Sequence, residues 1–129
     1  LTDMDAWAAA HQAAGRSVLF AGDLNVARTD LDIHPKERKL NQVGAREDER
    51  ALIERLLSRG LVDVGRTLHP ADDALFTWWA PWRNLKQRNI GWRIDYIVAS
   101  GPLASGAVTC VVQREFGTSD HGPVVAIFA

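Results

Sequence analysis

Apolar residues recur along the chain with two different spacings, which predict helices mainly in its first half and strands mainly in its second. Spacings of three and four predict helices over residues 4–14 and 47–59, which Gly15 and Gly60 terminate. Short apolar runs predict extended segments at 17–21, 61–64, 76–79, 92–99, 107–113 and 124–128. The sequence therefore predicts an α/β fold of the α+β sandwich type, with one sheet and flanking helices.

The length and composition are those of an ordinary globular domain. With 129 residues, 47% of them hydrophobic and 24% charged, the chain is neither disordered nor a coiled coil. No apolar run approaches the ~20 residues of a membrane-spanning helix. The single cysteine, Cys110, lies in an apolar run and cannot form an internal disulfide, so we expect a buried thiol in a reducing, cytoplasmic compartment.

The charges are distributed unevenly along the chain. The formal net charge is -1, which argues against a protein that coats nucleic acid through bulk charge. Residues 80–94, however, contain four cations and no acids, and four of the five tryptophans lie in residues 78–92. Cations neutralise phosphates and aromatic rings stack on bases or sugars, so we expect this segment to contact nucleic acid or a phosphorylated sugar. The alternative is that these tryptophans belong to the core.

The sequence Gly22-Asp23-Leu24-Asn25 follows the first predicted strand. Functional sites gather at strand ends, and an acid and an amide two residues apart can point to the same side. Asp23 can bind a metal ion or accept a proton from water. Asn25 can donate a hydrogen bond to a phosphoryl oxygen while its carbonyl faces a cation. The alternative is an ordinary turn, because all of these residue types favour turns.

A second acid-bearing segment, Ser119-Asp120-His121, precedes the last predicted strand. His121 can donate a proton or place a positive charge on a phosphoryl oxygen. Asp95 interrupts an otherwise apolar strand and needs a partner, because an unpaired buried charge is very costly. Two partners are available to it. One is Arg93, in a purely structural salt bridge, and the other is a histidine, in which case Asp95 would orient His121.

In this order along the chain, these segments resemble the exonuclease III family of apurinic/apyrimidinic DNA endonucleases, within the larger endonuclease/exonuclease/phosphatase group. The resemblance covers nearly the whole chain, and the sequence RNIGWRIDY at residues 88–96 favours the DNA-repair branch over the lipid and inositol phosphatases. The matching segments are 22–25, 30–36, 49–50, 76–79, 88–96 and 118–124. The fold implied is a four-layer αββα sandwich, of which residues 1–129 would be the C-terminal half.

The resemblance implies a divalent-metal site for phosphodiester hydrolysis. Asp23 would align the attacking water and accept its proton, and Asn25 would hold Asp23 and contact the scissile phosphate. His121 would contact a phosphoryl oxygen while Asp95 orients its ring, and these four residues are the predicted catalytic set. The implied ligands of Mg2+, or of Mn2+ in its place, are Asp23, Asn25, Asp120 and His121.

The resemblance also implies a DNA-binding surface. Trp92, with Trp78 and Ile94, would form an apolar pocket that accepts a flipped abasic sugar and excludes an intact nucleotide. The implied substrate is double-stranded DNA with abasic sites or 3′ ends, cleaved by abasic-site endonuclease or 3′-to-5′ exonuclease activity in base excision repair. The predicted DNA-contacting residues are Trp78, Arg88, Asn89, Trp92, Arg93 and Ile94.

The chain departs from the family pattern in two respects. It has Gly44-Ala45-Arg46 where the family usually has Gly-Phe-Thr, and it is much shorter than the family domain. The family's first half supplies an Asn and a Glu for the metal and a Tyr near the phosphate, and no segment here matches them. Since the chain also begins at Leu1, we expect a fragment or a cleaved product whose partner is the missing N-terminal half.

An incomplete site predicts that the isolated chain has little or no nuclease activity. A half-sandwich also predicts an exposed apolar face, and with it self-association or binding of the missing half. Two other functions are compatible with the same residues. One is a non-catalytic DNA-binding half-domain, and the other is a phosphatase of the same superfamily that acts on a phosphorylated small molecule or lipid.

Overall fold

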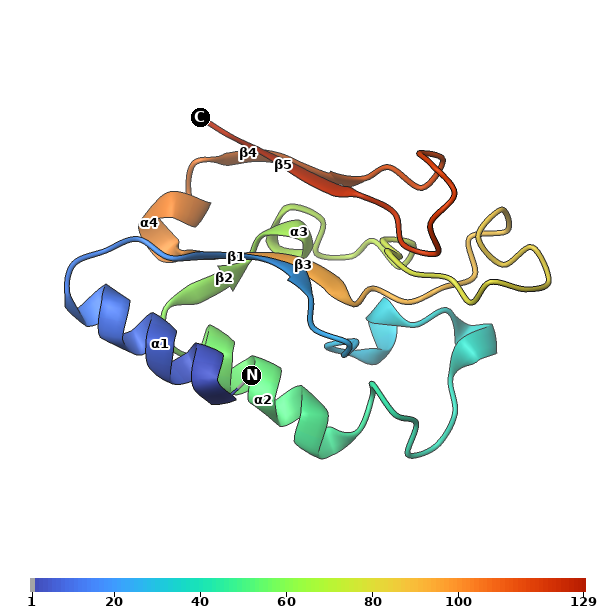
Figure 1. The fold of residues 1–129 in the computed structure, drawn as a ribbon, viewed down its shortest axis with the longest axis horizontal. Helices are drawn as coiled ribbons and strands as arrows, with labels where there is room; N and C mark the ends of the chain where they lie inside the picture. The colour runs from blue at the N-terminus through green and yellow to red at the C-terminus, as the bar shows by residue number, and fades with distance from the viewer. Residues whose placement is uncertain (1) are drawn as a thin grey trace.

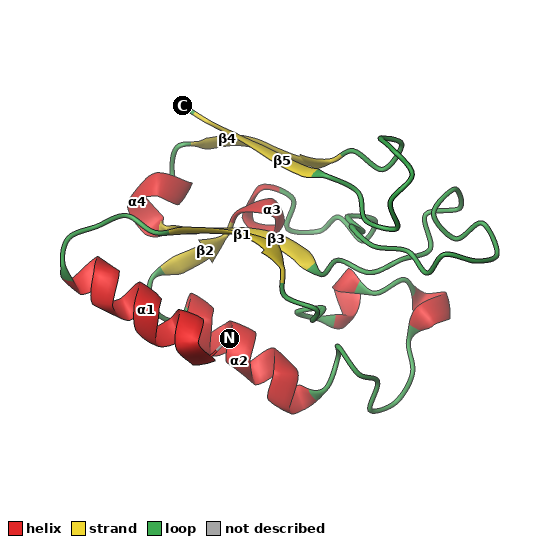
Figure 2. Cartoon of the chain, in the orientation of Figure 1, coloured by secondary structure: helices red, strands yellow, loops and turns green. Residues whose placement is uncertain are grey.

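The computed structural model describes residues 2–129 and shows a mixed α/β fold in layers, which confirms the predicted class (Figures 1 and 2). The helices are α1 (Thr2–Ala13), α2 (Glu47–Leu57), α3 (Val64–Leu68) and α4 (Gly101–Ala104), and the strands are β1 (Leu19–Asp23), β2 (Leu61–Asp63), β3 (Asp95–Ser100), β4 (Ala107–Val112) and β5 (Val124–Phe128). Helices α1 and α2 cover one face of the sheet formed by β1, β2 and β3, and β4 and β5 lie over its other face. None of the helices in this range has the length and apolar character needed to cross a membrane.

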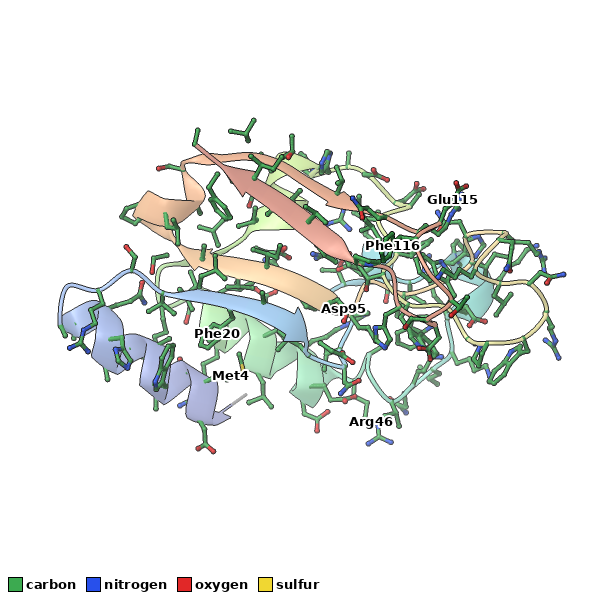
Figure 3. The ribbon with its side chains drawn as sticks, turned by 45° about the horizontal axis from the view of Figure 1, so that its top comes forward. Met4, Phe20, Arg46, Asp95, Glu115 and Phe116 are labelled. Carbon is green, nitrogen blue, oxygen red and sulfur yellow. The ribbon has the colours of Figure 1, made fainter. Side chains whose placement is uncertain are left out.

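Helix α2 shows how the sequence builds the helical layer. Its first turn carries three acids, which favour the positive end of the helix dipole, and Ile53 and Leu56 on its inner side are buried. These side chains join Val98 of β3 in one apolar core cluster. Met4 from α1 and Phe20 from β1 pack at the margin of that cluster (Figure 3). Burial of these side chains fixes the helices to the sheet, and so fixes where the strands end.

Strand β3 lies between β1 and β2, and both pairings are antiparallel. The register with β1 runs from Leu19 opposite Ala99 to Asp23 opposite Asp95. Two acids therefore stand side by side where β1 ends and β3 begins. Because a slip of one residue would turn one of these acids to the opposite face, the register itself brings them together.

The strands form two separate hydrogen-bonded sheets rather than the single sheet predicted. Among residues 2–129, β1, β3 and β2 make one sheet, and β4 and β5 make the other. Strands β1 and β2 occupy both edges of β3, so a third strand cannot join there. Five of the six residues of β3 are buried, so the face that α1 and α2 do not cover also needs an apolar cover. Cys110, Ala126 and Phe128 supply part of that cover. The chain therefore contributes strands to two layers of the fold.

Two stretches differ from the predicted elements. Segment 76–79 is not a regular strand, because Trp78 forms only isolated bridges, one of them with Trp92. The backbone N–H groups of Thr77 and Trp78 both donate to the Trp92 carbonyl, which breaks the alternation of a regular ladder. Because Trp92 takes part in this irregular pairing, the regular strand β3 begins only at Asp95. Helices α3 and α4 escape prediction because each is too short to show a helical period.

A buried network of ion pairs joins Asp32, Asp63 at the end of β2 and Arg93 just before β3. The Arg93 guanidinium donates hydrogen bonds to both Asp32 and Asp63, and Arg66 also donates to Asp32. Burial alone would lower the pKa of Arg93, but the hydrogen bonds and charges of Asp63 and Asp32 outweigh it and raise that pKa. Burial alone would raise the pKa of Asp32, but Arg93 and Arg66 hold that pKa below its usual value. Arg93 and Asp32 are therefore both charged at neutral pH.

We predict that Asp32→Asn lowers the free energy of unfolding by about 3–5 kcal/mol, because it leaves a buried Arg93 with one charged partner removed. Asp30→Asn, two positions away, removes only the exposed pair with Arg50 and should cost about 1 kcal/mol or less. Urea denaturation followed by circular dichroism measures both changes. Equal losses in the two variants at neutral pH would show that the buried network is not a determinant of stability.

The same pair of variants has a pH signature. Folding lowers the pKa of Asp32, so its contribution to stability is present above its unfolded pKa and is lost as the pH falls through the folded value. The stability gap between the parent chain and Asp32→Asn should therefore narrow in acid. A gap that stays constant as the pH falls contradicts the charge-based origin of the effect.

Candidate active site

Two strand ends and one loop bring three titratable side chains together. Asp23 closes β1, Asp95 opens β3, and His121 lies shortly before β5. His121 Nδ1 lies 2.9 Å from Asp95 Oδ2, and His121 Nε2 lies 3.9 Å from Asp23 Oδ2. Ligand atoms of all three residues lie within 4.8 Å of one another, a spacing that can hold a metal ion. Figure 3 shows Asp95 near the end of the layers where the long loops gather.

The hydrogen bond between Asp95 and His121 fixes the imidazole ring. Because a carboxylate can only accept, Nδ1 carries the proton donated to Asp95, and Nε2 faces Asp23. The His121 side chain is 34% exposed and that of Asp95 is 16% exposed, so a bound molecule reaches the pair from the histidine side. Of the two partners that the sequence offers to Asp95, the structure selects the histidine, and this geometry fits an orienting carboxylate.

Asn25 holds Asp23 in place. Its backbone has a left-handed conformation (φ 57°), and its N–H donates to Asp23 Oδ1 at 2.7 Å. With the amide nitrogen turned toward Asp23, the side chain also donates to Oδ2 at 3.1 Å. The amide oxygen of Asn25 is then left for another partner, such as a cation. The arrangement matches the predicted role of Asn25 toward Asp23, and its contact with a phosphate stays a prediction.

Asp120, another predicted metal ligand, is hydrogen-bonded to a tryptophan. Its Oδ2 accepts a hydrogen bond from the Trp78 indole nitrogen at 3.1 Å. Within the part of the chain that the structure describes, the group of possible ligands contains Asp95 and not Asp120. Metal binding by Asp120 stays a prediction. The structure adds Asp95, to which the sequence assigns only the orientation of His121, as a further candidate.

An apolar hollow opens beside the three titratable residues. The rings of Trp78 and Trp92 meet edge to face with their centroids 6.4 Å apart. The hollow has a volume of about 420 Å3 and is lined by Asn25, Val43, Gly44, Trp78, Trp92, Ile94 and His121. The three residues predicted to form a sugar pocket therefore lie together, and they lie directly beside His121.

Val43 and Gly44 form a wall of this hollow that sequence reasoning missed. Gly44 has a φ of +88°, and a Cβ at this position would lie 3.1 Å from the Asn25 carbonyl oxygen and 3.2 Å from the Trp92 ring. A glycine is therefore needed for the loop to approach the tryptophan so closely. The available signal was Gly44 itself, a glycine retained where the following two residues depart from the family pattern.

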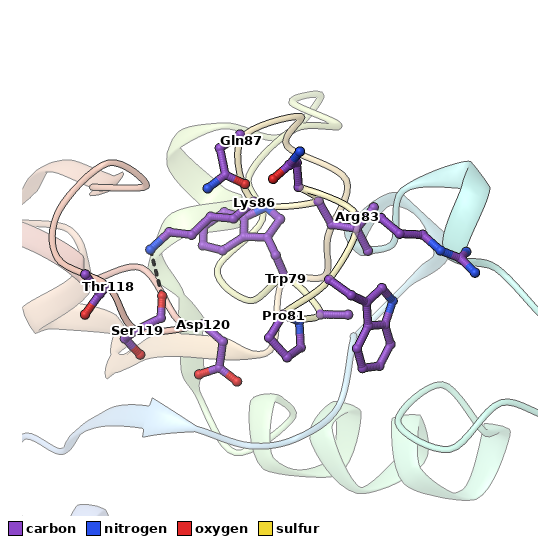
Figure 4. Close-up of a pocket in the computed structure, with 12 residues that line it drawn as sticks. Trp79, Pro81, Arg83, Lys86, Gln87, Thr118, Ser119 and Asp120 are labelled. Atoms are coloured by element: carbon purple, nitrogen blue, oxygen red, sulfur yellow. Dashed lines mark hydrogen bonds between the residues drawn. The ribbon is translucent and has the colours of Figure 1, made fainter.

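The aromatic and basic segment forms a long loop beside a second hollow (Figure 4). Trp82 is 60% exposed, and Arg83 and Asn84 both have a φ of 54°. Lys86 Nζ donates to the Ser119 carbonyl at 2.7 Å, which ties this loop to the segment that carries His121 (Figure 4). The hollow between the two loops has a volume of about 450 Å3. An exposed tryptophan among cations is what the predicted nucleic-acid contact requires.

Two of the predicted DNA-contacting residues make hydrogen bonds within the protein. Asn89 accepts a hydrogen bond from the Trp79 indole at 3.0 Å and donates one amide hydrogen to the Ala74 carbonyl; its DNA contact stays a prediction. Arg93 is 4% exposed and cannot reach a phosphate from the buried ion network. Its predicted contact with DNA gives way to a structural role, because two acids distant in the sequence bind it. Arg88 is exposed, and its DNA contact stays a prediction.

Gly91 allows the two tryptophan segments to pack closely. A Cβ at this position would collide with the Trp78 carbonyl oxygen and the Trp79 ring. We predict that Gly91→Ala costs about 1–3 kcal/mol of stability through overpacking and displaces Trp78. Gly101→Ala is the matched control, because the nearest atom to its added Cβ lies 3.9 Å away, and it should stay within about 1 kcal/mol of the parent.

Urea denaturation and tryptophan fluorescence report the two effects of Gly91→Ala separately. We expect a lower midpoint and a shifted emission maximum for Gly91→Ala, and neither change for Gly101→Ala. If both variants denature at the same midpoint, the close packing at Gly91 is not a constraint on the site.

Comparisons with known proteins give a consistent result. Residues 1–121 match the model of the Endonuclease/Exonuclease/phosphatase family. Over 112 residues the chain is 35% identical to an exodeoxyribonuclease of Bacillus subtilis, which covers 87% of this chain and 44% of that protein. A 3′-5′ exonuclease from Neisseria meningitidis matches the fold with a TM-score of 0.90 and 29% identity, over 98% of this chain and 51% of that one.

A third match is an AP endonuclease from Archaeoglobus fulgidus, with a TM-score of 0.79 and 33% identity over 88% of this chain and 46% of that one. The chain therefore spans about half the length of the proteins that it matches. The similarity extends over almost all of this chain, and over one portion of each longer relative.

Proposed function

Because the chain belongs to the endonuclease/exonuclease/phosphatase family, we propose that residues 1–129 form the C-terminal half of a divalent-metal-dependent DNA nuclease of base excision repair. The observation that carries this proposal is the cluster of Asp23, Asp95 and His121 beside an apolar hollow. Such a cluster contains groups that phosphodiester hydrolysis uses, and the hollow is suited to a sugar attached to the phosphate.

The donor atoms of the site fit a small, hard cation, and we propose Mg2+, with Mn2+ as a substitute. Mg2+ takes oxygen ligands from one or two carboxylates and keeps several waters. Asp23 offers a carboxylate oxygen, and the amide oxygen of Asn25 is left over once its nitrogen donates to Asp23. Asp120 is the other proposed ligand; His121 Nε2 cannot bind the cation while it donates to a phosphoryl oxygen, the role proposed for it. The cation would offset negative charge that develops on the phosphate during cleavage.

The proposed catalytic residues have distinct tasks. Asp23, held by two hydrogen bonds from Asn25, aligns the attacking water and takes its proton. His121 presents Nε2 to a phosphoryl oxygen. Asp95 keeps the ring in that orientation. The arrangement supplies a base, a hydrogen-bond donor for the phosphate, and a neighbouring residue that holds each of them in place, as phosphodiester hydrolysis requires.

We propose double-stranded DNA with abasic sites or 3′ ends as the substrate. The hollow beside Trp92 is walled by a second indole ring, and it fits a sugar that has lost its base. The exposed Trp82, Arg83 and Arg88 offer stacking and phosphate contacts. The similar proteins carry the names exodeoxyribonuclease, 3′-5′ exonuclease and AP endonuclease. We expect the protein to act in the cytoplasm, where the buried thiol of Cys110 stays reduced.

The proposed N-terminal half has two surfaces to occupy. On the outer face of β4 and β5, Val111, Val125 and Ile127 are 44%, 37% and 56% exposed. Among residues 2–129, β1 pairs with β3 alone, so its second edge, which ends at Asp23, is open. Folded domains usually cover apolar patches and strand edges of this kind. A strand added at the edge of β1 would bring further metal ligands alongside Asp23.

We predict that the 129-residue chain alone shows little or no cleavage of abasic duplex DNA in Mg2+, because part of the ligand set is missing. A gel assay with a labelled abasic duplex measures this, with the AP endonuclease from Archaeoglobus fulgidus as positive control and EDTA as negative control. Cleavage by the chain alone at rates like those of the complete relative overturns the half-domain proposal.

In the complete domain, we predict that Asp23→Asn lowers turnover by about 10²–10⁴-fold and spares DNA binding, because it removes the base and keeps the shape. Asp30→Asn, an exposed acid outside the site, is the matched control and should leave both properties unchanged. Turnover that survives Asp23→Asn within about tenfold shows that the assigned role is wrong.

The same assays separate the two rival functions. A complete domain that binds abasic DNA and does not cleave it in Mg2+ or Mn2+ is a DNA-binding module. One whose cleavage of DNA is strongly inhibited by inositol phosphates, and which hydrolyses them faster than DNA, is a phosphatase of the same superfamily. Either result contradicts the proposed repair activity.

A further inference from the structure

Thr77 is hydrogen-bonded both to the start of β3, which carries Asp95, and to the segment that carries His121. Its side chain is buried, and its residue as a whole is 1% exposed. The hydroxyl Oγ1 accepts hydrogen bonds from the backbone N–H groups of Ile94, at 3.0 Å, and of Asp95, at 3.1 Å. Its backbone carbonyl accepts from the N–H of Gly122 at 2.8 Å. One residue therefore holds the backbone of Asp95 and the backbone next to His121.

Among residues 2–129, no strand pairs with the backbone of Asp95 on the side of β2. Strand β2 pairs with β3 only from Leu61 opposite Ser100 to Asp63 opposite Val98, and so ends before it reaches Asp95. The Thr77 hydroxyl takes the place of a strand partner there. A buried N–H without a partner is costly, so this hydroxyl sets the path of the chain into β3.

On the histidine side, the bond from Gly122 to Thr77 is supported by a second backbone bond, from the Trp79 N–H to the Asp120 carbonyl at 3.0 Å. One bond is made by the residue before His121 and the other by the residue after it. The 2.9 Å contact between His121 Nδ1 and Asp95 Oδ2 therefore joins two segments that Thr77 and its neighbours hold in register.

We propose that Thr77 is a positioning residue of the site: its hydroxyl and carbonyl set the distance and orientation of the Asp95–His121 pair. The expected effect of Thr77 on the rate of DNA cleavage rests on the proposed function. Its expected effect on the geometry of the Asp95–His121 pair rests on the hydrogen bonds alone. A ring held by Asp95 in one orientation presents Nε2 to the space beside Asp23. Loss of the hydroxyl lets the backbone of Asp95 move, and a displacement of this kind at a catalytic group reduces the rate of the chemical step.

The test compares three variants of the complete domain. Thr77→Val keeps the shape and removes the hydroxyl, and Thr77→Ser keeps the hydroxyl. Ser100→Ala is the matched control, because the Ser100 hydroxyl also accepts a buried backbone N–H, from Val18 at 2.8 Å, but at the opposite end of β3. All variants are assayed at a temperature where circular dichroism shows them folded.

We expect Thr77→Val to lower kcat on abasic duplex DNA by about tenfold to a hundredfold with little change in KM. Thr77→Ser should retain kcat near the parent value, and Ser100→Ala should retain kcat even though it loses stability. Equal kcat in Thr77→Val and Ser100→Ala overturns the proposal. If Thr77→Val does not fold, Thr77→Ser still tests the proposal. A strongly reduced kcat in Thr77→Ser overturns the proposal, because this variant keeps the hydroxyl to which the positioning role is assigned.

A spectroscopic readout tests the geometry without any assay of activity. The Nδ1 proton of His121, donated to Asp95, should give a low-field proton resonance in the parent, in Thr77→Ser and in Ser100→Ala, and should be shifted or lost in Thr77→Val. An unchanged resonance in Thr77→Val refutes the positioning role. If the parent domain cleaves no DNA but the resonance behaves as expected, the proposed function fails and the role of Thr77 stands.

Discussion

The antiparallel register between β1 and β3 places Asp23 opposite Asp95, and the site is built on that pairing. Two carboxylates side by side repel each other, so the pairing needs support from elsewhere. The apolar core supplies it, because Val98 and its buried neighbours hold β3 against α2 and β1. His121, between the two acids, supplies the nearest positive charge when it is protonated. Stability from the core thus maintains an arrangement that the local charges alone would not favour.

The cations of the fold are distributed so that the site keeps its negative character. Among residues 2–129, the buried acids Asp32 and Asp63 pair with three arginines, and Arg93 lies between them. The ion pairs of Asp23 and Asp95 in the same range involve only His121. Arginines are therefore kept out of the pair of acids, which favours binding of a cation there. The exposed basic residues lie instead on the neighbouring loop, where a polyanion can reach them.

The sequence predicted what depends on neighbouring residues, and it was less reliable where the outcome depends on distant ones. The family resemblance is confirmed. The contact between Asn25 and Asp23 could be expected from the sequence, because the two residues lie two positions apart at the end of a strand. The partner of Asp95 stayed open between Arg93 and a histidine, because Arg93 is bound by Asp32, 61 residues away. The roles of the individual residues in catalysis stay predictions.

The same limit explains the two features of the fold and site that the sequence did not reveal. Whether β4 joins the first sheet depends on which edges of β3 are occupied, and β2 occupies one of them from a distant part of the chain. Gly44 forms a wall of the hollow because its loop packs against Trp92, which lies 48 residues later in the sequence. Apolar periodicity reports which face of an element is buried, and it does not report what covers that face.

If the chain is one half of a domain, as proposed, the division of its strands between two sheets explains why that half alone would be insufficient for the proposed function. A fragment that formed one complete sheet would leave only a face to be covered. This chain instead contributes to both sheets, with an open edge of β1 that ends at Asp23 and an exposed face on β4 and β5. Asp23 of the candidate site is the last residue of that open edge, so under the proposal further metal ligands and structural support would come from the same added strand. Under the proposal, completion of the fold and completion of the metal site are therefore one event, and metal affinity should depend on association of the two halves.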